Sequence, residues 1–597
     1  MSQPESLCVA FQATARQIPD QVALRTTGDA VSITWREYAD RVRRIAAGLA
    51  ALGVGRGETV GIMLTNRPEF HLVDTAALHL GAVPFSVYNT SAAEQLTYVF
   101  SNAGNKIVVT EQVFLPTLRA VDADLKIICV DGEAEGAMTL ADLEAAGTPD
   151  FDFDATWGAV EPEDLATIIY TSGTTGPPKG VELTHRNVLA VTDAVRAAYE
   201  VAPGDRVLSF LPSAHIADRV IAHYLSMFFG TVVTSVADPR QLASALPDAR
   251  PHVFFGVPRV WQKFKLAIDT ALAAEPSGAK RKIAAWALAV GRRHALLQLA
   301  GDSIPATLGV QHKLADKLVL SKLRHKLGLA EAKVPASGAA AIPVDTIEFF
   351  WGIGIPVYEI WGMSETGGLG TSCRAGAVKL GTVGTPVHGA EITLADDGEL
   401  LIRAGSVMRG YRNDPEKTAD TVDADGWVHT GDIGVIDADG FVSIVDRKKE
   451  LIINSSGKNM SPTNIENAVK AASSLIGQVV AIGDDRPYIS ALIVVDQDAA
   501  TALAAKHGLD PSSPSTVLSH DSLRTLITDA VRKGNTTLSR VEQIKRFRIV
   551  PTFWEPGGDE LTPTLKLRRK PIAEKYAHDI DDLYADSPTP ATVNLNT

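Results

Sequence analysis

Short apolar runs alternate with segments of helical length from about residue 34 to residue 260. Residues 58–64 and 166–170 are predicted strands, and residues 68–80 are the predicted helix after the first of them. Residues 253–257 form another apolar run of strand length, again followed by a helical pattern. This alternation predicts α/β units built around largely parallel sheets.

The segment 276–333 interrupts this alternation. Its apolar residues recur at helical spacing, and no convincing strand lies between them. Residues 276–330 contain ten lysines and arginines against Asp302 and Asp316, a local charge of 10 − 2 = +8. We predict a helical insertion with a basic surface. That surface is either a solvated helix face or a contact for anionic lipid headgroups or a phosphorylated cofactor.

Beyond about residue 395 the segments are short and separated by turn sequences, which indicates small β-hairpins. Thr184 and Ser461 are expected to cap the N-termini of two helices, and Pro462 suits a first helical turn. The polar run Asp446-Arg447-Lys448-Lys449 follows a strand and is a candidate hinge. The tail from about residue 586 is rich in Pro, Thr, Asn and Ser, so we expect it to be disordered.

The overall composition narrows the function. The 597 residues include 57 Lys and Arg against 70 Asp and Glu, a net charge of −13, which excludes nucleic-acid binding driven by bulk positive charge. The three cysteines are far apart in sequence and form neither a disulfide framework nor a metal knuckle. No signal peptide is recognised, and the apolar stretch 224–237 is too short to span a bilayer, which takes ~20 residues. We therefore expect a cytoplasmic protein.

The most informative segment is Tyr170-Thr-Ser-Gly-Thr-Thr-Gly-Pro-Pro-Lys-Gly180. It follows an apolar strand, and its backbone N–H groups, hydroxyls and lysine can surround a polyphosphate. It is not a Walker A loop, because Pro178 precedes the lysine and Gly180 follows it. The candidate phosphate-binding residues are Thr171, Ser172, Gly173, Thr174, Thr175, Gly176 and Lys179.

Further motifs follow this loop in order. They are Trp361-Gly-Met-Ser-Glu365, Trp427-Val-His-Thr-Gly-Asp432, Asp446-Arg-Lys-Lys-Glu-Leu451 and Leu561-Thr-Pro-Thr-Leu-Lys-Leu-Arg-Arg569. Together with the loop they resemble the adenylate-forming superfamily of acyl-CoA synthetases, firefly luciferase and nonribosomal-peptide adenylation domains. The resemblance covers roughly residues 30 to 580. The last motif has the form found in long-chain fatty acyl-CoA synthetases, whereas Ser364 departs from the usual threonine.

The resemblance implies a role for each motif residue. Trp361 would pack against adenine, Ser364 would lie near the phosphates, Glu365 would hold Mg²⁺, and Asp432 would bond the ribose hydroxyls. In the C-terminal motifs, Arg447 would contact the nucleotide, Lys449 would be the hinge, and Lys566 would be the catalytic lysine.

The resemblance also implies the architecture. It gives an α/β fold with a large N-terminal domain, residues 1–445, made of two α/β subdomains and a β-barrel-like subdomain. A small, mobile α+β domain, residues 446–597, would carry Lys566 into the site for one step and move away for the next. The helical insertion 276–333 is similar to the extra region of long-chain synthetases.

The segment Leu211-Pro-Ser-Ala-His-Ile-Ala-Asp-Arg219 resembles the floor of the family's acyl site. His215 would orient the substrate carboxylate or gate the acyl tunnel there, although a structural histidine is the alternative. The apolar stretch 224–237 suits a pocket wall, as it would suit a core. Asp218 is the one candidate for binding a substrate ammonium, and its position does not match well. We therefore favour an uncharged acyl tail.

These features predict a long-chain fatty acid–CoA ligase that uses ATP, Mg²⁺ and coenzyme A. Attack of a carboxylate on the α-phosphate brings two anions together, so Mg²⁺ and the lysines would stabilise the developing charge. The alternatives are a fatty acyl-AMP ligase that serves an acyl carrier protein, and a non-catalytic nucleotide-binding protein. We expect a long-chain fatty acid and CoA as partners, no nucleic acid, and a monomer or homodimer. Peripheral membrane contact through the insertion 276–333 is the alternative to a solvated basic face.

Overall fold

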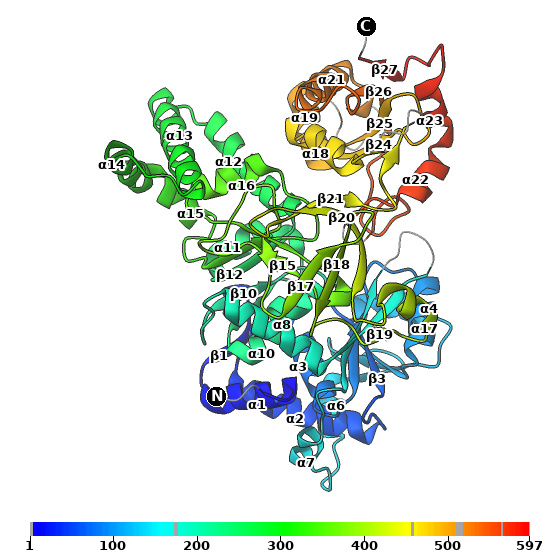
Figure 1. Cartoon of the computed structure of the whole chain (residues 1–597). Coiled ribbons are helices and arrows are strands. Elements are labelled where there is room, and N and C mark those ends of the chain that lie inside the picture. Colours follow the sequence, from blue (N-terminus) through cyan, green and yellow to red (C-terminus); the bar gives the residue numbers. More distant parts are fainter. Residues whose placement is uncertain are drawn as a thin grey trace.

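The computed structural model describes residues 4–171, 177–454, 459–508, 510, 517–562 and 565–595. Figure 1 shows the C-terminal elements, from α18 to β27, gathered at one end of the molecule beyond the sheets of the N-terminal part. The N-terminal part contains one parallel sheet, one sheet with a parallel centre and antiparallel edges, and an antiparallel region. The predicted α/β class and the small C-terminal α+β unit are confirmed.

The first α/β subdomain is a parallel sheet in the order β4-β3-β5-β6-β7. All of β3 is buried, as expected for a parallel strand covered by helices on both faces. The predicted strand 58–64 and helix 68–80 are β3 and α3, and Pro68 occupies the first turn of that helix. The strands are β3 (Thr59–Met63), β4 (Val83–Ser86), β5 (Ile107–Thr110), β6 (Lys126–Cys129) and β7 (Ala137–Thr139). The helices include α2 (Trp35–Ala51), α3 (Pro68–Leu78), α4 (Ala93–Ala103), α5 (Leu115–Arg119), α6 (Leu140–Ala145) and α7 (Phe153–Gly158).

The second α/β subdomain contains a sheet in the order β16-β15-β14-β13-β12-β10-β11-β1-β2. Its centre, from β1 to β14, is parallel. The strands are β1 (Val22–Thr26), β2 (Ser32–Thr34), β10 (Arg206–Ser209), β11 (Val232–Ser235), β12 (Val253–Gly256), β13 (Val334–Ser337), β14 (Tyr358–Trp361), β15 (Thr371–Ser372) and β16 (Thr385–Pro386). The helices include α1 (Leu7–Gln17), α8 (His185–Ala198), α10 (Leu225–Phe229), α11 (Leu242–Ala249), α12 (Pro258–Ala273) and α16 (Val344–Gly352).

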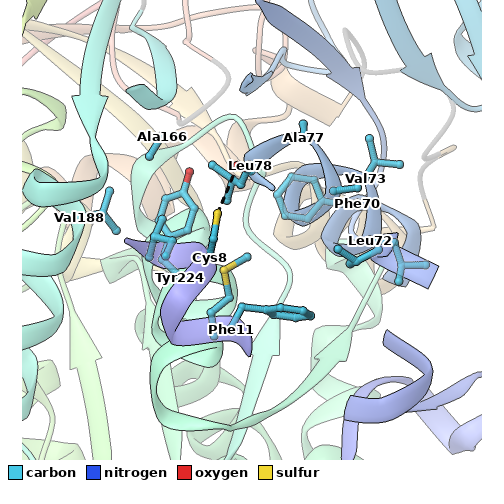
Figure 2. Packing of buried hydrophobic residues seen from close by; sticks show 14 of the residues in the cluster. Cys8, Phe11, Phe70, Leu72, Val73, Ala77, Leu78, Ala166, Val188 and Tyr224 are labelled. Atoms are coloured by element: carbon cyan, nitrogen blue, oxygen red, sulfur yellow. Dashed lines mark hydrogen bonds between the residues drawn. The ribbon is translucent and has the colours of Figure 1, made fainter. Parts of the chain in front are cut away.

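One continuous apolar core joins the two α/β subdomains. Figure 2 shows α1 entering this core, with Cys8 and Phe11 among side chains from α3, α8 and the segment around Tyr224. The Cys8 thiol donates to the carbonyl oxygen of Leu78, 3.2 Å away. Because the subdomains share buried side chains, residues at their junction are held firmly.

The insertion 276–333 is helical, as predicted. It contains α13 (Gly278–Leu299), α14 (Ala306–Ala315), the π-helix η5 (Asp316–Leu320) and α15 (Ser321–Lys326). In Figure 1 α13 and α14 project from the side of the second subdomain. The insertion packs on α16, where a side chain at Gly291 would meet the carbonyl of Gly352.

The third region of the N-terminal part is antiparallel. A sheet in the order β17-β18-β20-β21 packs around Leu400, Ile402 and Val428, with Trp361 at its border. A separate sheet has the order β19-β9-β8. The elements are β8 (Leu165–Thr171), β9 (Lys179–Thr184), β17 (Ala390–Leu394), β18 (Glu399–Ala404), β19 (Gly410–Tyr411), α17 (Pro415–Thr421), β20 (Val428–Ile436) and β21 (Val442–Arg447).

The C-terminal unit is a sheet in the order β24-β25-β26-β27 with helices on both faces. Alternating strand residues pack against α18, α19 and α21 on one face and against α22 and α23 on the other. Its elements are β22 (Ile452–Ile453), β23 (Asn459–Met460), α18 (Pro462–Ala472), β24 (Ile476–Ile482), β25 (Ile489–Val495), α19 (Gln497–His507), α21 (Asp521–Asn535), β26 (Ile544–Ile549), α22 (Arg569–Lys575), α23 (Ala577–Tyr584) and β27 (Thr592–Asn594).

Two local expectations about helix caps are confirmed, and one about the tail is wrong. Thr184 caps α8 in a capping box with Asn187, and the Ser461 hydroxyl accepts from Asn464 at the start of α18. The tail from about residue 586 was expected to be disordered because of its composition. Instead β27 pairs antiparallel with β26, so backbone hydrogen bonds order a segment that has few apolar side chains.

Candidate active site

The predicted phosphate loop connects two paired strands. Thr171 ends β8 and lies opposite Lys179 at the start of β9. Ser172, Gly173, Thr174, Thr175 and Gly176 lie outside the described residues. The antiparallel pairing holds Lys179 beside the loop. The Lys179 ammonium lies 5.0 Å from the centre of the Tyr411 ring, a cation–π contact.

Glu365 lies in a tight turn, η6 (Ser364–Thr366), between β14 and β15. Its carboxylate accepts a hydrogen bond from the Tyr411 hydroxyl, with 2.6 Å between the oxygens. Its carbonyl oxygen accepts from the Met408 amide at 2.8 Å. Met408 and Tyr411, just before and in β19, thus fix the turn and the Glu365 carboxylate. The same turn carries Ser364. The hydrogen bond from Tyr411 leaves the other carboxylate oxygen available to a ligand.

Trp361 and Asp432 come together although they are far apart in sequence. The indole N–H of Trp361 donates to one Asp432 oxygen at 2.8 Å, and the Arg447 guanidinium lies 2.7 Å from the other. Burial raises the pKa of Asp432, and Arg447 opposes that rise. Each carboxylate oxygen keeps a further lone pair, so ribose hydroxyls could still donate to it.

Lys566 belongs to the C-terminal unit but shares an environment with these N-terminal residues. Its side chain remains accessible to solvent, yet surrounding protein and the nearby Arg447 lower its pKa. Asp432, Glu450 and Glu365 oppose that change, which places all of them within electrostatic reach of Lys566. The backbone N–H of Lys566 donates to the Thr562 hydroxyl at 3.0 Å. The charges of Glu365 and Asp432 thus act on Lys566 across the boundary between the two parts of the chain.

Ion pairs between α12 and the C-terminal unit accompany this placement. The Arg259 guanidinium contacts the Asp496 carboxylate at 2.5 Å and donates to the Gly477 carbonyl at 2.9 Å. Lys263 lies 3.1 Å from Asp498. Partly exposed pairs of this kind contribute little stability each, so they can break at small cost.

Lys449 is an exposed residue in the turn that follows β21. Its neighbours are tied to opposite sides: Lys448 pairs with Glu399 of β18 at 2.9 Å, and Glu450 pairs with Arg569 of α22 at 3.1 Å. The positive charge of Lys449 contributes to a lowered pKa of Lys179, after desolvation and Lys417. The turn thus lies between contacts to β18 and α22, and the charge of Lys449 acts on Lys179.

His215 is the N-cap of the short helix α9 (Ile216–Asp218). Its Nδ1 accepts from the Ala217 amide at 3.2 Å, so the proton of the neutral ring is on Nε2. Burial, with a contribution from Lys566, lowers the pKa of His215 to about 4. A neutral imidazole that donates from Nε2 suits a carboxylate or an acyl oxygen.

The Asp218 carboxylate is held by contacts within the protein, so Asp218 is not assigned a role in substrate binding. Its carboxylate is buried and accepts from the Ser209 hydroxyl at 2.8 Å and from the Leu211 amide at 3.2 Å. Burial raises its pKa to about 7. The stretch 224–237 forms α10 and β11, and most of its apolar side chains pack into the shared core. Of the two alternatives for this stretch, a pocket wall and a core, Tyr224 and Leu225 are seen in the core.

Sequence reasoning missed one residue of this site. Tyr411 links Glu365 to Lys179, but it lies in a two-residue strand with no motif of its own.

The donor set fits the group that the motifs imply. Within the described residues no cluster of three or more His, Cys, Asp or Glu could hold a metal ion alone. Mg²⁺ commonly takes one or two carboxylates together with substrate phosphates and water, and Glu365 beside the phosphate loop offers one such carboxylate.

Comparisons with known proteins agree with this geometry. Residues 11–412 match the family described as AMP-binding enzyme, and residues 449–588 match the AMP-binding enzyme C-terminal domain. The chain is 52% identical over 458 residues to a Mycobacterium tuberculosis protein named as a fatty-acid–CoA ligase, FadD11, covering 76% of this chain and 80% of that protein. It is 34% identical over 585 residues to the long-chain-fatty-acid–CoA ligase FadD15 of the same species, covering 95% of each.

Solved structures share the fold at low sequence identity. The anthranilate CoA ligase AuaEII in complex with anthranoyl-AMP aligns with a TM-score of 0.73 and 17% identity, over 97% of this chain and 99% of that chain. A Mycobacterium tuberculosis fatty acyl CoA synthetase aligns with a TM-score of 0.61 and 21% identity, over 97% and 100%. Of the helices that the structure describes, none is long and apolar enough to cross a membrane.

Proposed function

Because the chain belongs to the AMP-binding enzyme family, we propose that it is a long-chain fatty acid–CoA ligase of the AMP-forming type. ATP and a fatty acid give acyl-AMP and pyrophosphate, and CoA then displaces AMP to form the acyl thioester. The single observation that carries the proposal is that Asp432 contacts both Trp361 and Arg447, so residues from three of the motifs meet at one carboxylate. The similarity to FadD15 over 95% of both chains supports the fatty acid as substrate.

In the first step a fatty carboxylate oxygen attacks the α-phosphorus, and the bond to pyrophosphate breaks. Lys179 and Lys566 neutralise the charge that develops on the phosphates. The hydroxyls and glycines of the loop, Thr171, Ser172, Gly173, Thr174, Thr175 and Gly176, bind the same phosphates with Ser364. No bond between enzyme and substrate is required.

The nucleoside is held from the opposite side. Trp361 packs against adenine, Asp432 accepts from the ribose hydroxyls, and Arg447 contacts the nucleotide. The contacts of Asp432 with Trp361 and Arg447 fix its carboxylate before ATP arrives. Glu365 would hold Mg²⁺, and the ion would supply neutralisation of phosphate charge. Tyr411 orients that carboxylate through its hydroxyl.

His215 donates from Nε2 to the fatty carboxylate. Its neutral state follows from burial, and the Ala217 amide fixes the tautomer. A neutral donor can orient the attacking carboxylate without pairing with it as a fixed positive charge.

The second step needs a different placement of the C-terminal domain, with Lys449 as the hinge. The boundary near residue 445 and the mobility of the domain 446–597 are part of the proposal. Its support is that the ion pairs Arg259–Asp496 and Lys263–Asp498, which link α12 to the C-terminal unit, are partly exposed and therefore weak. Movement about the turn would withdraw Lys566 and admit the CoA thiol.

Product analysis tests the function. The purified chain is incubated with ATP, Mg²⁺ and fatty acids from short to very long, and pyrophosphate, AMP and acyl-CoA are quantified. We expect pyrophosphate release that depends on a long-chain acid and AMP release that depends on CoA. If AMP release instead requires an acyl carrier protein, the chain is an acyl-AMP ligase. Absence of pyrophosphate with every acid would contradict the proposal.

The insertion is proposed to contact an anionic membrane surface peripherally. Val310, Leu314 and Leu318 follow each other at four-residue spacing and are 69%, 51% and 42% exposed. Lys313 and Lys317 lie on the same exposed face. Aliphatic side chains flanked by lysines suit the interface of a bilayer with negative headgroups.

Vesicle sedimentation tests this contact. The variant Val310→Gln/Leu314→Gln should bind vesicles of anionic lipid more weakly, and added salt should weaken binding of the parent chain. Val113→Gln is the matched control, since Val113 is also 69% exposed but lies in the first subdomain. If both variants bind the vesicles equally, the basic face is a solvated surface and the membrane contact is rejected.

A further inference from the structure

A buried ion pair joins the two α/β subdomains directly behind the His215 segment. The Asp74 carboxylate of α3 pairs with the Arg219 guanidinium, and both side chains are fully buried. The second Asp74 oxygen lies 2.8 Å from Nε2 of His223, which is also buried. The Arg219 guanidinium lies over the Phe70 ring, 5.5 Å from its centre. Figure 2 labels Phe70 among the buried side chains of the shared core. Charges so far from water must be balanced by their neighbours.

The protonation states in this group follow from its geometry. His223 donates from Nε2 to Asp74, and its Nδ1 lies 3.0 Å from Nδ1 of His71. With burial lowering the pKa of both rings, each is neutral, so His71 donates from Nδ1 to His223. Asp74 and Arg219 are then the charged members, and they neutralise each other.

Arg219 also bonds to the strand beneath the site. Its guanidinium donates to the Ser86 hydroxyl at 2.9 Å and to the Pro84 carbonyl at 3.1 Å, both on β4. Ser86 in turn accepts from the Ser213 hydroxyl at 3.4 Å. Ser213 lies two residues before His215, so this chain of contacts reaches the segment that carries the imidazole.

The backbone around His215 is held at both of its ends. Asp218 ties the following helix back to Ser209 and Leu211. Arg219 begins the π-helix η3 (Arg219–Tyr224), and its guanidinium donates to the Tyr224 hydroxyl at 2.9 Å. Single π-turns are rare and occur frequently at functional sites. The segment is therefore positioned by directional contacts as well as by apolar packing.

The net contribution of such a pair to stability is small. Replacing a buried ion pair by apolar side chains of similar volume is often neutral or stabilising. The pair instead fixes the relative positions of the elements around it. The planar guanidinium of Arg219 has five N–H donors, and these reach α3, β4 and Tyr224.

We propose that Arg219, held by Asp74 and bonded through Ser86 to Ser213, is a positioning residue that sets the orientation of the His215 imidazole toward the fatty carboxylate. It acts through His215 and touches neither substrate. The inference rests on the proposed function, because it takes the role of His215 from there.

The test uses Ser86→Ala, which removes one hydroxyl between Arg219 and Ser213 and is small enough to fold. In fatty-acid-dependent pyrophosphate release, we expect its KM for the fatty acid to rise about fivefold while its KM for ATP is unchanged. Arg219→Gln should raise the same KM by about tenfold or more, and Arg219→Lys should recover part of that loss. Gln12→Leu is the control, since it removes a buried hydrogen bond to His79 in the same core.

A double-mutant cycle separates positioning from general destabilisation. If Arg219 acts through His215, then adding Ser86→Ala to His215→Ala changes the fatty acid KM little beyond His215→Ala alone. Additive effects, or equal KM changes for ATP and acid in Ser86→Ala, would overturn the inference. If the parent chain activates no fatty acid, the proposed function fails instead. An active parent with an unchanged Ser86→Ala variant refutes the positioning role alone.

Discussion

Two groups of charged residues in this molecule differ in their access to solvent. Around Asp74 and Arg219 the opposite charges meet inside the protein, and both side chains are fully buried. Around Lys566, surrounding protein and Arg447 lower the pKa of the lysine, and Asp432, Glu450 and Glu365 oppose that change. Lys566 and Arg447 are exposed. The first group is closed to a ligand, whereas the cations of the second remain accessible to a polyphosphate.

The largest effect is expected where the balanced pair is broken. Asp74→Asn leaves the Arg219 guanidinium buried without its counter-ion and should destabilise the N-terminal domain by about 3–5 kcal/mol. Thermal unfolding measured by circular dichroism checks this. A melting temperature within a degree of that of the parent chain would show that the interior tolerates an unpaired charge. The proposed difference between the two groups would then be wrong.

Removing a charge from the ligand-binding group should affect catalysis and leave folding intact. Lys566→Ala should lower acyl-AMP formation by about 100-fold or more, since charge in the transition state loses a preorganised partner. Thioester formation from supplied acyl-AMP should survive, with the melting temperature unchanged. Rapid-quench measurement of each half-reaction separates the two, and parallel loss of both would refute the assignment of Lys566 to the first step.

The hinge supplies the next smaller effect. Lys449→Pro restricts the backbone of the turn, so thioester formation should fall about tenfold more than pyrophosphate release. Lys448→Pro is not a suitable control, because Lys448 donates its N–H to Gly431. Lys449→Ala serves instead, since it removes the charge but keeps the backbone free. Proportional loss of both steps in the proline variant would argue against a hinge at this position.

The pH profile offers a test without large structural change. The pKa of Lys566 is lowered, so its ammonium loses the proton at a lower pH than an ordinary lysine. Adenylation that depends on the charged form is complete at low pH within the working range and falls as pH rises through that lowered pKa. Lys566→Arg should move the alkaline fall to higher pH, because arginine stays protonated. If the alkaline fall stays at the same pH in this variant, the observed titration does not belong to Lys566.

The smallest effect concerns the contact between the domains. Arg259→Ala removes the ion pair with Asp496 and the bond to Gly477. Because partly exposed pairs contribute about 1 kcal/mol or less, adenylation should slow by at most about fivefold. Arg240→Ala, at an exposed arginine elsewhere in the domain, is the control. A loss above a hundredfold would mean that Arg259 acts in chemistry as well as in docking.

Much of the architecture was predictable from the residues alone. Apolar periodicity gave β3, α3 and β8 nearly to their bounds, and capping residues gave the starts of α8 and α18. These features depend on contacts within a few residues of each other. The tail was predicted wrongly because pairing of β27 with β26 depends on a strand about 45 residues earlier in the chain.

The residues of the candidate site also differ in whether the sequence could predict them. Lys179, Glu365, Asp432 and Lys566 were predicted from motifs, and their places in the chemistry stay predictions. Tyr411 could not be found, since only the pairing of β19 with β9 brings it to Glu365. The partners of Arg219 could not be found either, because Asp74 and Ser86 lie more than 130 residues away in sequence. Contacts between subdomains leave no local pattern in the chain.

The short strand β27 has a consequence for handling the protein. It covers the hydrogen-bonding edge of β26, and an uncovered edge strand can pair with a second molecule. Truncating the chain before Thr592 would therefore leave β26 as an uncovered edge strand that can pair with a second molecule. The Pro- and Thr-rich ending thus keeps this edge of β26 paired within the domain that carries Lys566.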